Sequence, residues 1–375
     1  MHRALDLTLF DFRLQRPPLE IDQTRSLELI LDGHVASERT RAALDDASRA
    51  RFETRMRKIV MRCGCDPSRI ARRGYTLADS REIYEVDRLP HGKGTLARML
   101  VYEKEVARYF EEAYADDDAP SDIVHVTCTG YVAPSGAQAL VARRGWGERT
   151  RVTHAYHMGC YAAIPALRVA EGCLRTSNAA EPRTDVVHTE LCTLHLDPAD
   201  HTIEQIVVQS LFADGCMRYS IEHGERERGL RCVATSERVV PDSGGSMRWV
   251  MADWGMQMTL ARDVPEKVGA VLRPFVSDLL AHADLSMRDL PRLELAVHPG
   301  GPRIIDGVRE TLELDERQVA FSRGVLRDYG NMSSATLPHV WQRMLESDDV
   351  ARGTPIVSLA FGPGLTVCGA VFVKT

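Results

Sequence analysis

Three short segments of this 375-residue chain carry side chains that together could transfer an acyl group. Cys160 lies in the run YHMGCYAA, His298 begins the run HPGGP, and Asn331 lies in the run YGNMSS. A thiol can hold an acyl group as a thioester, an imidazole can exchange a proton with that thiol, and a carboxamide can donate a hydrogen bond to a developing oxyanion. The three residue types therefore indicate covalent acyl transfer by cysteine.

The surroundings of Cys160 favour a reactive thiol. The thiolate is the nucleophile, and an ordinary thiol is mostly protonated at neutral pH. Cys160 follows Gly159 and precedes an alanine-rich stretch, 161–174, that we expect to be helical. A helix N-terminus favours an anion, and His298 as an imidazolium would favour it further. A single cysteine is more often a buried core residue, so the His298 and Asn331 segments are what favour catalysis.

These segments resemble those of type III polyketide synthases, the chalcone-synthase-like members of the thiolase superfamily. The run Phe361-Gly362-Pro363-Gly364 resembles the glycine-proline loop of that family, and the resemblance extends from about residue 90 to the end. It implies a homodimer with the α/β thiolase fold, which has five αβαβα layers built from two similar halves. Here the halves would be residues 1–225, with the nucleophilic cysteine, and 226–375, with the histidine and asparagine.

The resemblance also implies a substrate pocket. Phe212 matches the family's gatekeeper phenylalanine, and Met258 falls where plant members place a second one, if Asp263-Val264-Pro265 anchors the register. The other pocket candidates are Leu194, Cys128, Thr129, Phe361, Gly362, Pro363 and Gly364. The family binds the phosphates of coenzyme A with basic residues of its N-terminal helices, for which the candidates are Lys58, Arg62, Arg72 and Arg73.

The activity that the resemblance implies is decarboxylative Claisen condensation. An acyl-CoA starter would acylate Cys160, and malonyl-CoA would lose carbon dioxide beside His298 and Asn331 to give an enolate that attacks the acyl thioester. The run 190–195 (ELCTLH) resembles bacterial members, among which enzymes that make alkylpyrones or alkylresorcinols from fatty acyl starters are common. Coenzyme A thioesters would be substrates, with no bound cofactor and no metal.

Three alternatives stay open at this point. A ketoacyl-ACP synthase of the same fold shares the Cys-His-Asn set, but the HPGGP and FGPG runs argue against it. A cysteine hydrolase would need a general base for water and would release free acid without malonyl-CoA. A non-enzymatic scaffold with a relict pocket is disfavoured by the intact set of three residues.

Composition excludes several other classes of protein. The net charge of −6 does not provide the basic footprint of a nucleic-acid-binding protein. No apolar run reaches the ~20 residues of a membrane-spanning helix, and the start of the chain lacks the apolar core of a secretory signal, so we expect a cytoplasmic enzyme. The nine cysteines are scattered, which favours reduced thiols over a disulfide framework.

The local pattern predicts alternating helices and strands, which indicates a layered α/β fold. Helices are expected over 36–63, 95–114, 161–174, 264–283 (with Asp263 as the N-cap), from 302 onward and over 334–346. Strands are expected over 123–128, 151–157, 186–191, 249–251, 293–297, 356–361 and 365–372, the last two as a hairpin.

Overall fold

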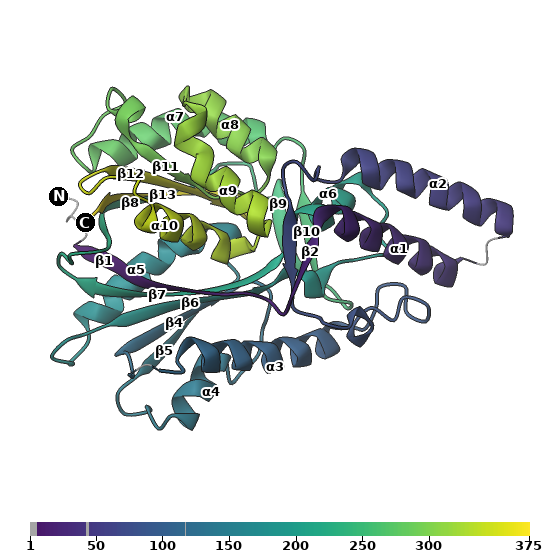
Figure 1. Cartoon of the computed structure of the whole chain (residues 1–375), viewed down its shortest axis with the longest axis horizontal. Helices are drawn as coiled ribbons and strands as arrows, with labels where there is room; N and C mark the ends of the chain where they lie inside the picture. The colour runs from purple at the N-terminus through teal and green to yellow at the C-terminus, as the bar shows by residue number, and fades with distance from the viewer. Residues whose placement is uncertain (1–5, 43–44, 117) are drawn as a thin grey trace.

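The computed structural model describes residues 6–42, 45–116 and 118–375. Nine strands of the described chain form one sheet, in the order β11-β12-β13-β8-β1-β7-β6-β4-β5 (Figure 1). These strands are β1 (Leu7–Gln15), β4 (Asp122–Thr127), β5 (Arg151–Tyr156), β6 (Thr184–Leu191), β7 (Asp214–His223), β8 (Leu230–Val239), β11 (Glu294–Val297), β12 (Pro355–Gly362) and β13 (Thr366–Lys374). Two small antiparallel pairs complete the strands: β2 (Leu19–Asp22) with β3 (Arg72–Tyr75), and β9 (Met247–Met251) with β10 (Met256–Leu260).

The sheet repeats one pattern in its two halves. From the centre outward, β1-β7-β6-β4 and β8-β13-β12-β11 both pair antiparallel, antiparallel and then parallel. β1 pairs with β8 where the halves meet, and β5 is an additional edge strand of the first half. The expected duplication is therefore present in the topology, although the sequences of the halves show no convincing identity. The division that we proposed after residue 225 falls between β7 and β8.

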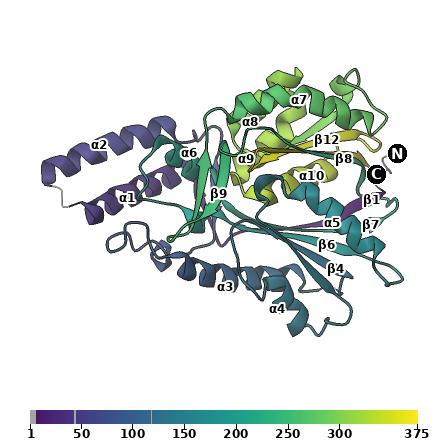
Figure 2. The ribbon, with the colours of Figure 1, turned by 180° about the vertical axis from the view of Figure 1, so that it is seen from behind.

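Helices cover both halves and fill the space between them (Figures 1 and 2). The central layer is α5 (Ala163–Arg175) with α10 (Thr336–Glu346), whose apolar faces share one core cluster with strands of both halves. One outer layer is α3 (Thr95–Ala113) with α4 (Gly136–Arg143). The other contains α7 (Val264–Ala281), α8 (Pro302–Leu312) and α9 (Ala320–Tyr329). The arrangement is the five-layered αβαβα order that we expected.

The first helical segment differs from its prediction. Instead of one helix over 36–63, the chain forms α1 (Gln23–Arg41) and α2 (Asp46–Cys63), which pack together as an arm that projects from the sheet (Figures 1 and 2). The physical reason is capping: Asp45 accepts a hydrogen bond from the backbone N–H of Ser48, which starts a new helix there. We missed this N-cap because the stretch lacks the proline or glycine that usually marks a break.

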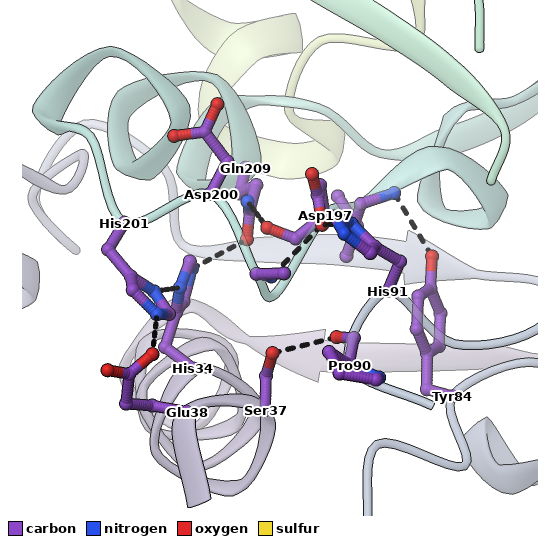
Figure 3. A network of polar contacts seen from close by, with 12 residues as sticks. His34, Ser37, Glu38, Tyr84, Pro90, His91, Asp197, Asp200, His201 and Gln209 are labelled. Carbon is purple, nitrogen blue, oxygen red and sulfur yellow. Dashed lines mark hydrogen bonds and ion pairs between the residues drawn. The ribbon is translucent and has the colours of Figure 1, made fainter. Parts of the chain in front are cut away.

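A chain of polar contacts attaches the arm to α6 (Ile203–Leu211), the helix that leads to Phe212 (Figure 3). His34 Nδ1 of α1 lies 2.9 Å from His201 Nδ1, and His34 Nε2 lies 3.1 Å from Gln209 Oε1. His201 Nε2 lies 3.2 Å from a carboxylate oxygen of Glu38, back on α1. The arm and the element that positions Phe212 are thereby held together through buried or half-buried groups.

The other predicted helices and strands are confirmed, with ends shifted by at most two residues. The hairpin of β12 and β13 closes the chain as expected. Asp263 lies at the N-cap of α7 but makes no capping hydrogen bond; its carboxylate instead lies 3.0 Å from Lys267 Nζ. Within the described chain, no helix combines the length and apolar character that crossing a membrane requires.

Candidate active site

Cys160 lies in a tight turn between β5 and α5. It belongs to the short 3-10 helix η2 (Gly159–Tyr161), and it is 6% exposed. Gly159 has φ of +71°, and a Cβ at that position would lie 2.8 Å from Cδ of Pro363. A Cβ at Gly362 would lie 2.5 Å from the ring of Tyr161. The glycine-proline loop therefore packs directly on the turn that contains Cys160, and the glycines on both sides permit that close approach.

His298 follows β11, where its backbone N–H donates to the Leu359 carbonyl at 2.7 Å. Both ring nitrogens are buried, and neither has a hydrogen-bond partner in the described part of the chain. Gly300 packs beside the ring: a Cβ there would lie 3.4 Å from Nε2. The imidazole is therefore held by packing, and its nitrogens are free to exchange a proton with a substrate or thiol.

Asn331 lies between α9 and the turn η6 (Ser333–Ala335) with its carboxamide already oriented. Its Oδ1 accepts from the Ser333 backbone N–H at 2.9 Å, and its Nδ2 donates to the Gly300 carbonyl at 3.1 Å. An amide nitrogen has two hydrogens, so one donor remains for an oxyanion. Asn331 also forms a β-bridge with Phe212, which connects the predicted oxyanion donor to the predicted gatekeeper.

The charge states differ from our expectation. Burial raises the pKa of the Cys160 thiol to about 12, and burial lowers the pKa of His298 to about 3. The cause is desolvation, which penalises a lone thiolate or a lone imidazolium more than the start of α5 compensates. The free site therefore holds a neutral thiol and a neutral imidazole, and a proton moving from one to the other would leave the pair with no net charge.

A small cavity lies beside Cys160. Its lining residues are Cys128, Thr129, Gly159, Cys160, Cys192, Phe212, Trp249, Met258, Ser333 and Pro363. Five of the predicted pocket residues are thus brought together: Phe212, Met258, Cys128, Thr129 and Pro363. The free volume is about 20 Å³, little more than one water molecule needs. A substrate therefore requires side chains of the lining to move.

Leu194 does not line the cavity, whereas Cys192, two residues earlier in the chain, does. Leu194 is fully buried in the core cluster under α3, whereas Cys192 lines the cavity. Both belong to the 3-10 helix η3 (Cys192–His195), in which neighbouring side chains point in different directions. Of the loop residues, Phe361 is 2% exposed and packs in the core with α7, and Gly364 has φ of +90°.

Sequence reasoning also missed Trp249 and Ser333. Trp249 pairs directly with Met258 across the β9-β10 hairpin, so both side chains lie on one face. The register of that hairpin was the signal that could have identified Trp249. Ser333 Oγ lies 3.7 Å from Cys160 Sγ and 3.0 Å from Cys128 Sγ, and its place in the YGNMSS run was the signal for it.

The buried carboxyl of Glu190 joins the walls of this site. It accepts hydrogen bonds from Thr129 Oγ1 at 2.9 Å and from the Cys128 backbone N–H at 3.1 Å. On its other side it accepts from the Ser334 hydroxyl in the turn that follows Asn331. Burial raises the pKa of Glu190. Glu190 therefore links the cavity wall to the turn that follows Asn331.

The candidate residues for binding the phosphates of coenzyme A differ in solvent exposure. Lys58 and Arg62 are exposed on α2, and Arg72 is exposed with an ion pair to Glu20 at 3.7 Å. Arg73 is fully buried, and its guanidinium donates to carbonyls of α6 and Phe212 at 2.6 Å each. Its proposed role in phosphate binding is therefore wrong: the charge is used to hold the end of α6.

Comparison with known proteins identifies the family. The model of the N-terminal domain of chalcone and stilbene synthases matches residues 91–222, and the model of their C-terminal domain matches residues 231–374. The chain belongs to the chalcone and stilbene synthase family. It is therefore a type III polyketide synthase, an acyltransferase with the thiolase fold.

Relatives and solved structures agree with this assignment. The chain is 29% identical to 1,3,6,8-tetrahydroxynaphthalene synthase of Streptomyces griseus over 74% of this chain and 75% of that one. It is 30% identical to 3,5-dihydroxyphenylacetyl-CoA synthase of Amycolatopsis orientalis, over 66% of this chain and 67% of that one. Probable polyketide synthase 1 of Dictyostelium discoideum is 33% identical over 67% of this chain. The matched region makes up only 8% of that much longer protein.

The fold is that of solved type III synthases. The structure superposes on the type III domain of Steely1, a type I/III hybrid from Dictyostelium, with a TM-score of 0.79 at 23% identity, over 98% of this chain and 99% of that one. It superposes equally well on tetrahydroxynaphthalene synthase of Streptomyces coelicolor, with the same TM-score, identity and coverage.

Proposed function

We propose that this chain loads an acyl-CoA starter onto Cys160, extends it with malonyl-CoA and cyclises the product. The observation that carries the proposal is a buried thiol at the cavity together with a carboxamide, Asn331, whose Nδ2 donates to Gly300, the residue that packs against the unpartnered imidazole of His298. His298 takes the thiol proton as sulfur attacks the starter thioester, and coenzyme A leaves as the thiol. Malonyl-CoA then loses carbon dioxide, and His298 with the free N–H of Asn331 stabilises the enolate oxygen. Attack of the enolate carbon on the acyl thioester forms the new C–C bond and frees Cys160.

The starter that we propose is a fatty acyl group, with a pyrone or resorcinol as product. Met258 lines the cavity, and an unbranched thioether can move aside for a polymethylene chain. Each methylene that such a chain buries contributes about 0.8 kcal/mol. Preference should therefore rise with chain length until the space that opens is filled.

A second candidate is a synthase that uses a short starter. It is favoured by the free volume of about 20 Å³ and by Trp249, whose indole occupies the same wall as Met258. Two relatives bear the name 1,3,6,8-tetrahydroxynaphthalene synthase, which denotes a compact aromatic product of those enzymes.

One experiment separates the two candidates. Purified protein is incubated with malonyl-CoA alone, and with malonyl-CoA plus each straight-chain acyl-CoA from acetyl to palmitoyl, and products are identified by mass spectrometry. A fatty starter predicts alkyl-substituted products with kcat/KM rising with chain length, and Met258→Phe should move the optimum to shorter chains. Products from malonyl-CoA alone, at rates that added acyl-CoA does not change, would support the second candidate.

We also infer a homodimer. Support comes from β5, which is the edge strand of the large sheet and has no partner along its outer side in the described chain. Tyr131 beside it is 65% exposed. Light scattering should give twice the 41.8 kDa of one chain. A monomer at micromolar concentration with full activity would contradict this inference.

A further inference from the structure

Ser333 has an unusual backbone conformation beside Cys160. Its φ is +49°, in the left-handed region that residues with a side chain seldom adopt. Two hydrogen bonds hold this conformation: its N–H donates to Asn331 Oδ1, and its carbonyl accepts from Thr336 Oγ1, both at 2.9 Å. Backbone strain of this kind persists only where the surrounding structure fixes it, and it is concentrated at functional sites. The conformation places the buried Ser333 hydroxyl against the Cys160 sulfur.

The Ser333 hydroxyl lies between two thiols. Its Oγ is 3.7 Å from Cys160 Sγ and 3.0 Å from Cys128 Sγ. The Cys128 sulfur in turn lies 3.5 Å from a carboxylate oxygen of Glu190. We call these four side chains, in the order Cys160, Ser333, Cys128 and Glu190, the thiol–hydroxyl row. All four are buried, so their polar hydrogens bond mainly within the row.

The direction of these hydrogen bonds can follow the charge of Cys160. A thiol and a hydroxyl each carry one hydrogen and can also accept, whereas an ionised carboxylate only accepts. With a neutral Cys160, each member of the row donates to the next, and Cys128 donates to Glu190. With a Cys160 thiolate, the first two bonds reverse: Ser333 donates to the charged sulfur, and Cys128 donates to Ser333. The reversal requires rotation of two hydrogens and no transfer of a proton.

A donor at the sulfur matters because the site excludes water. Burial raises the pKa of the Cys160 thiol to about 12, and the charge of Glu190 adds to this effect. The hydrogen bond of Ser333 is the largest opposing effect, with a smaller one from the carboxamide of Asn331. Both ring nitrogens of His298 lack a hydrogen-bond partner in the part of the chain that the structure describes. In the free enzyme, the Cys160 sulfur is therefore in contact with Ser333 before it exchanges a proton with the imidazole.

We propose that Ser333 is a catalytic donor that stabilises the Cys160 thiolate, and that Cys128 is a positioning residue that turns the Ser333 hydroxyl toward it. This rests on the proposed function, in which Cys160 attacks an acyl thioester. The S–C bond to Cys160 forms as the S–C bond to coenzyme A breaks, and the thiol proton passes through His298 to the departing sulfur. Ser333 keeps its own proton throughout. Once the sulfur carries the acyl group it has no charge, and the hydroxyl turns back to Cys128.

The test measures the ionisation of Cys160 separately from turnover. Alkylation of Cys160 by iodoacetamide, located by peptide mass spectrometry, is followed against pH in wild type, Ser333→Ala and Ser333→Gly. Glycine removes the hydroxyl but accepts the left-handed backbone, so this variant keeps the turn. A hydrogen bond to a charged group is strong enough that we expect both variants to be alkylated about tenfold more slowly at a given pH, a shift of the profile by about one pH unit. Acylation by hexanoyl-CoA should slow by a similar factor.

Cys128 is tested with a matched pair of substitutions. Cys128→Ala and Cys192→Ala each remove one thiol from the same cavity, but only the first thiol contacts Ser333 in the described chain. We expect the pH profile of Cys160 alkylation to shift in Cys128→Ala and to stay in place in Cys192→Ala. Cys128→Ser keeps a donor beside Ser333 and should restore the wild-type profile.

Several results would overturn the proposal. An unchanged profile in both Ser333 variants would mean that the hydroxyl does not stabilise the thiolate. A shift in Ser333→Ala that Ser333→Gly abolishes, together with a recovered melting temperature, would assign Ser333 to the structure of its turn. Equal shifts in Cys128→Ala and Cys192→Ala would remove Cys128 as the positioning residue. Acylation is the separate readout: a wild type that takes no acyl group from hexanoyl-CoA would refute the proposed function, whereas the alkylation profiles decide the role of Ser333.

Discussion

Gly159 and Pro363 interlock across the two halves of the molecule: a Cβ at position 159 would lie 2.8 Å from Cδ of the proline. Gly159 also has φ of +71°, where an L-residue costs about 1–2 kcal/mol. Gly159→Ala should therefore displace Cys160 and lower product formation by about 10²-fold, measured with saturating substrates. Gly172→Ala in α5 is the matched control, because a Cβ there meets nothing within 4 Å. Equal activity of both variants would show that the contact does not position the thiol.

The reactivity of Cys160 should depend on His298. Burial raises the pKa of the thiol to about 12 although a hydrogen bond from Ser333 lowers it, and a proton acceptor inside the site would offset the effect of burial further. The rate of alkylation by iodoacetamide, followed against pH, should rise at lower pH in wild type than in His298→Gln. Cys160→Ala identifies the alkylation that belongs to other cysteines. Superimposable profiles for wild type and His298→Gln would mean that the imidazole does not accept the proton.

Asn331 should act in decarboxylation as well as condensation. Its carboxamide is held by Gly300 and Ser333 with one N–H free, so Asn331→Ala removes one oxyanion donor. Loss of such a donor typically costs about 10²–10³ in rate. Release of carbon dioxide from malonyl-CoA should fall together with product formation. Unchanged release in the variant would limit Asn331 to a structural role in its turn.

Trp249 should limit the length of the product. Its indole lines the cavity and donates its N–H to the Cys128 carbonyl. Trp249→Ala opens space beside Met258, so we expect longer starters or additional extensions, detected as heavier products by mass spectrometry. Trp249→Phe keeps most of the volume and should change the product far less. An identical product spectrum from all three proteins would place the growing chain elsewhere.

Acid should destabilise the fold through buried histidines such as His195. Its Nε2 lies 2.8 Å from the Thr129 carbonyl and its Nδ1 accepts from the Met256 N–H, so both nitrogens are used by the neutral ring. Burial lowers the pKa of His195 from 6.5 to about 3. The unfolded chain binds the extra proton first, so stability is complete above pH 6.5 and is lost as pH falls toward 3.

At pH 5, His195 alone should cost about 2 kcal/mol of unfolding free energy relative to pH 7.5. Urea unfolding of wild type and His195→Asn at the two pH values measures this directly. The variant is expected to start less stable but to lose less stability on acidification. An equal loss in both proteins would show that His195 is not protonated on unfolding.

Much of this enzyme could be predicted from local sequence. The segments around Cys160, His298 and Asn331 retain the residue types that the chemistry requires, and the glycine-proline loop retains the glycines that its close packing requires. The alternation of strands and helices indicated the layered fold, because period-2 and period-3.6 patterns are properties of single segments. The start of α2 could also have been predicted, because Asp45 is a residue type that caps helices and its carboxylate accepts from the Ser48 backbone N–H.

The tertiary structure decided the burial, the contacts and the pKa of individual side chains, because these depend on the residues that surround each one. The same residue type gave opposite outcomes: Arg73 is buried and binds carbonyls of the backbone, whereas Arg62 is exposed on α2. The choice between Leu194 and Cys192 in the cavity followed from a 3-10 turn that the sequence does not signal. The pKa of Cys160 depends on how completely water is excluded around it, and exclusion of water is set by segments distant in sequence that pack together.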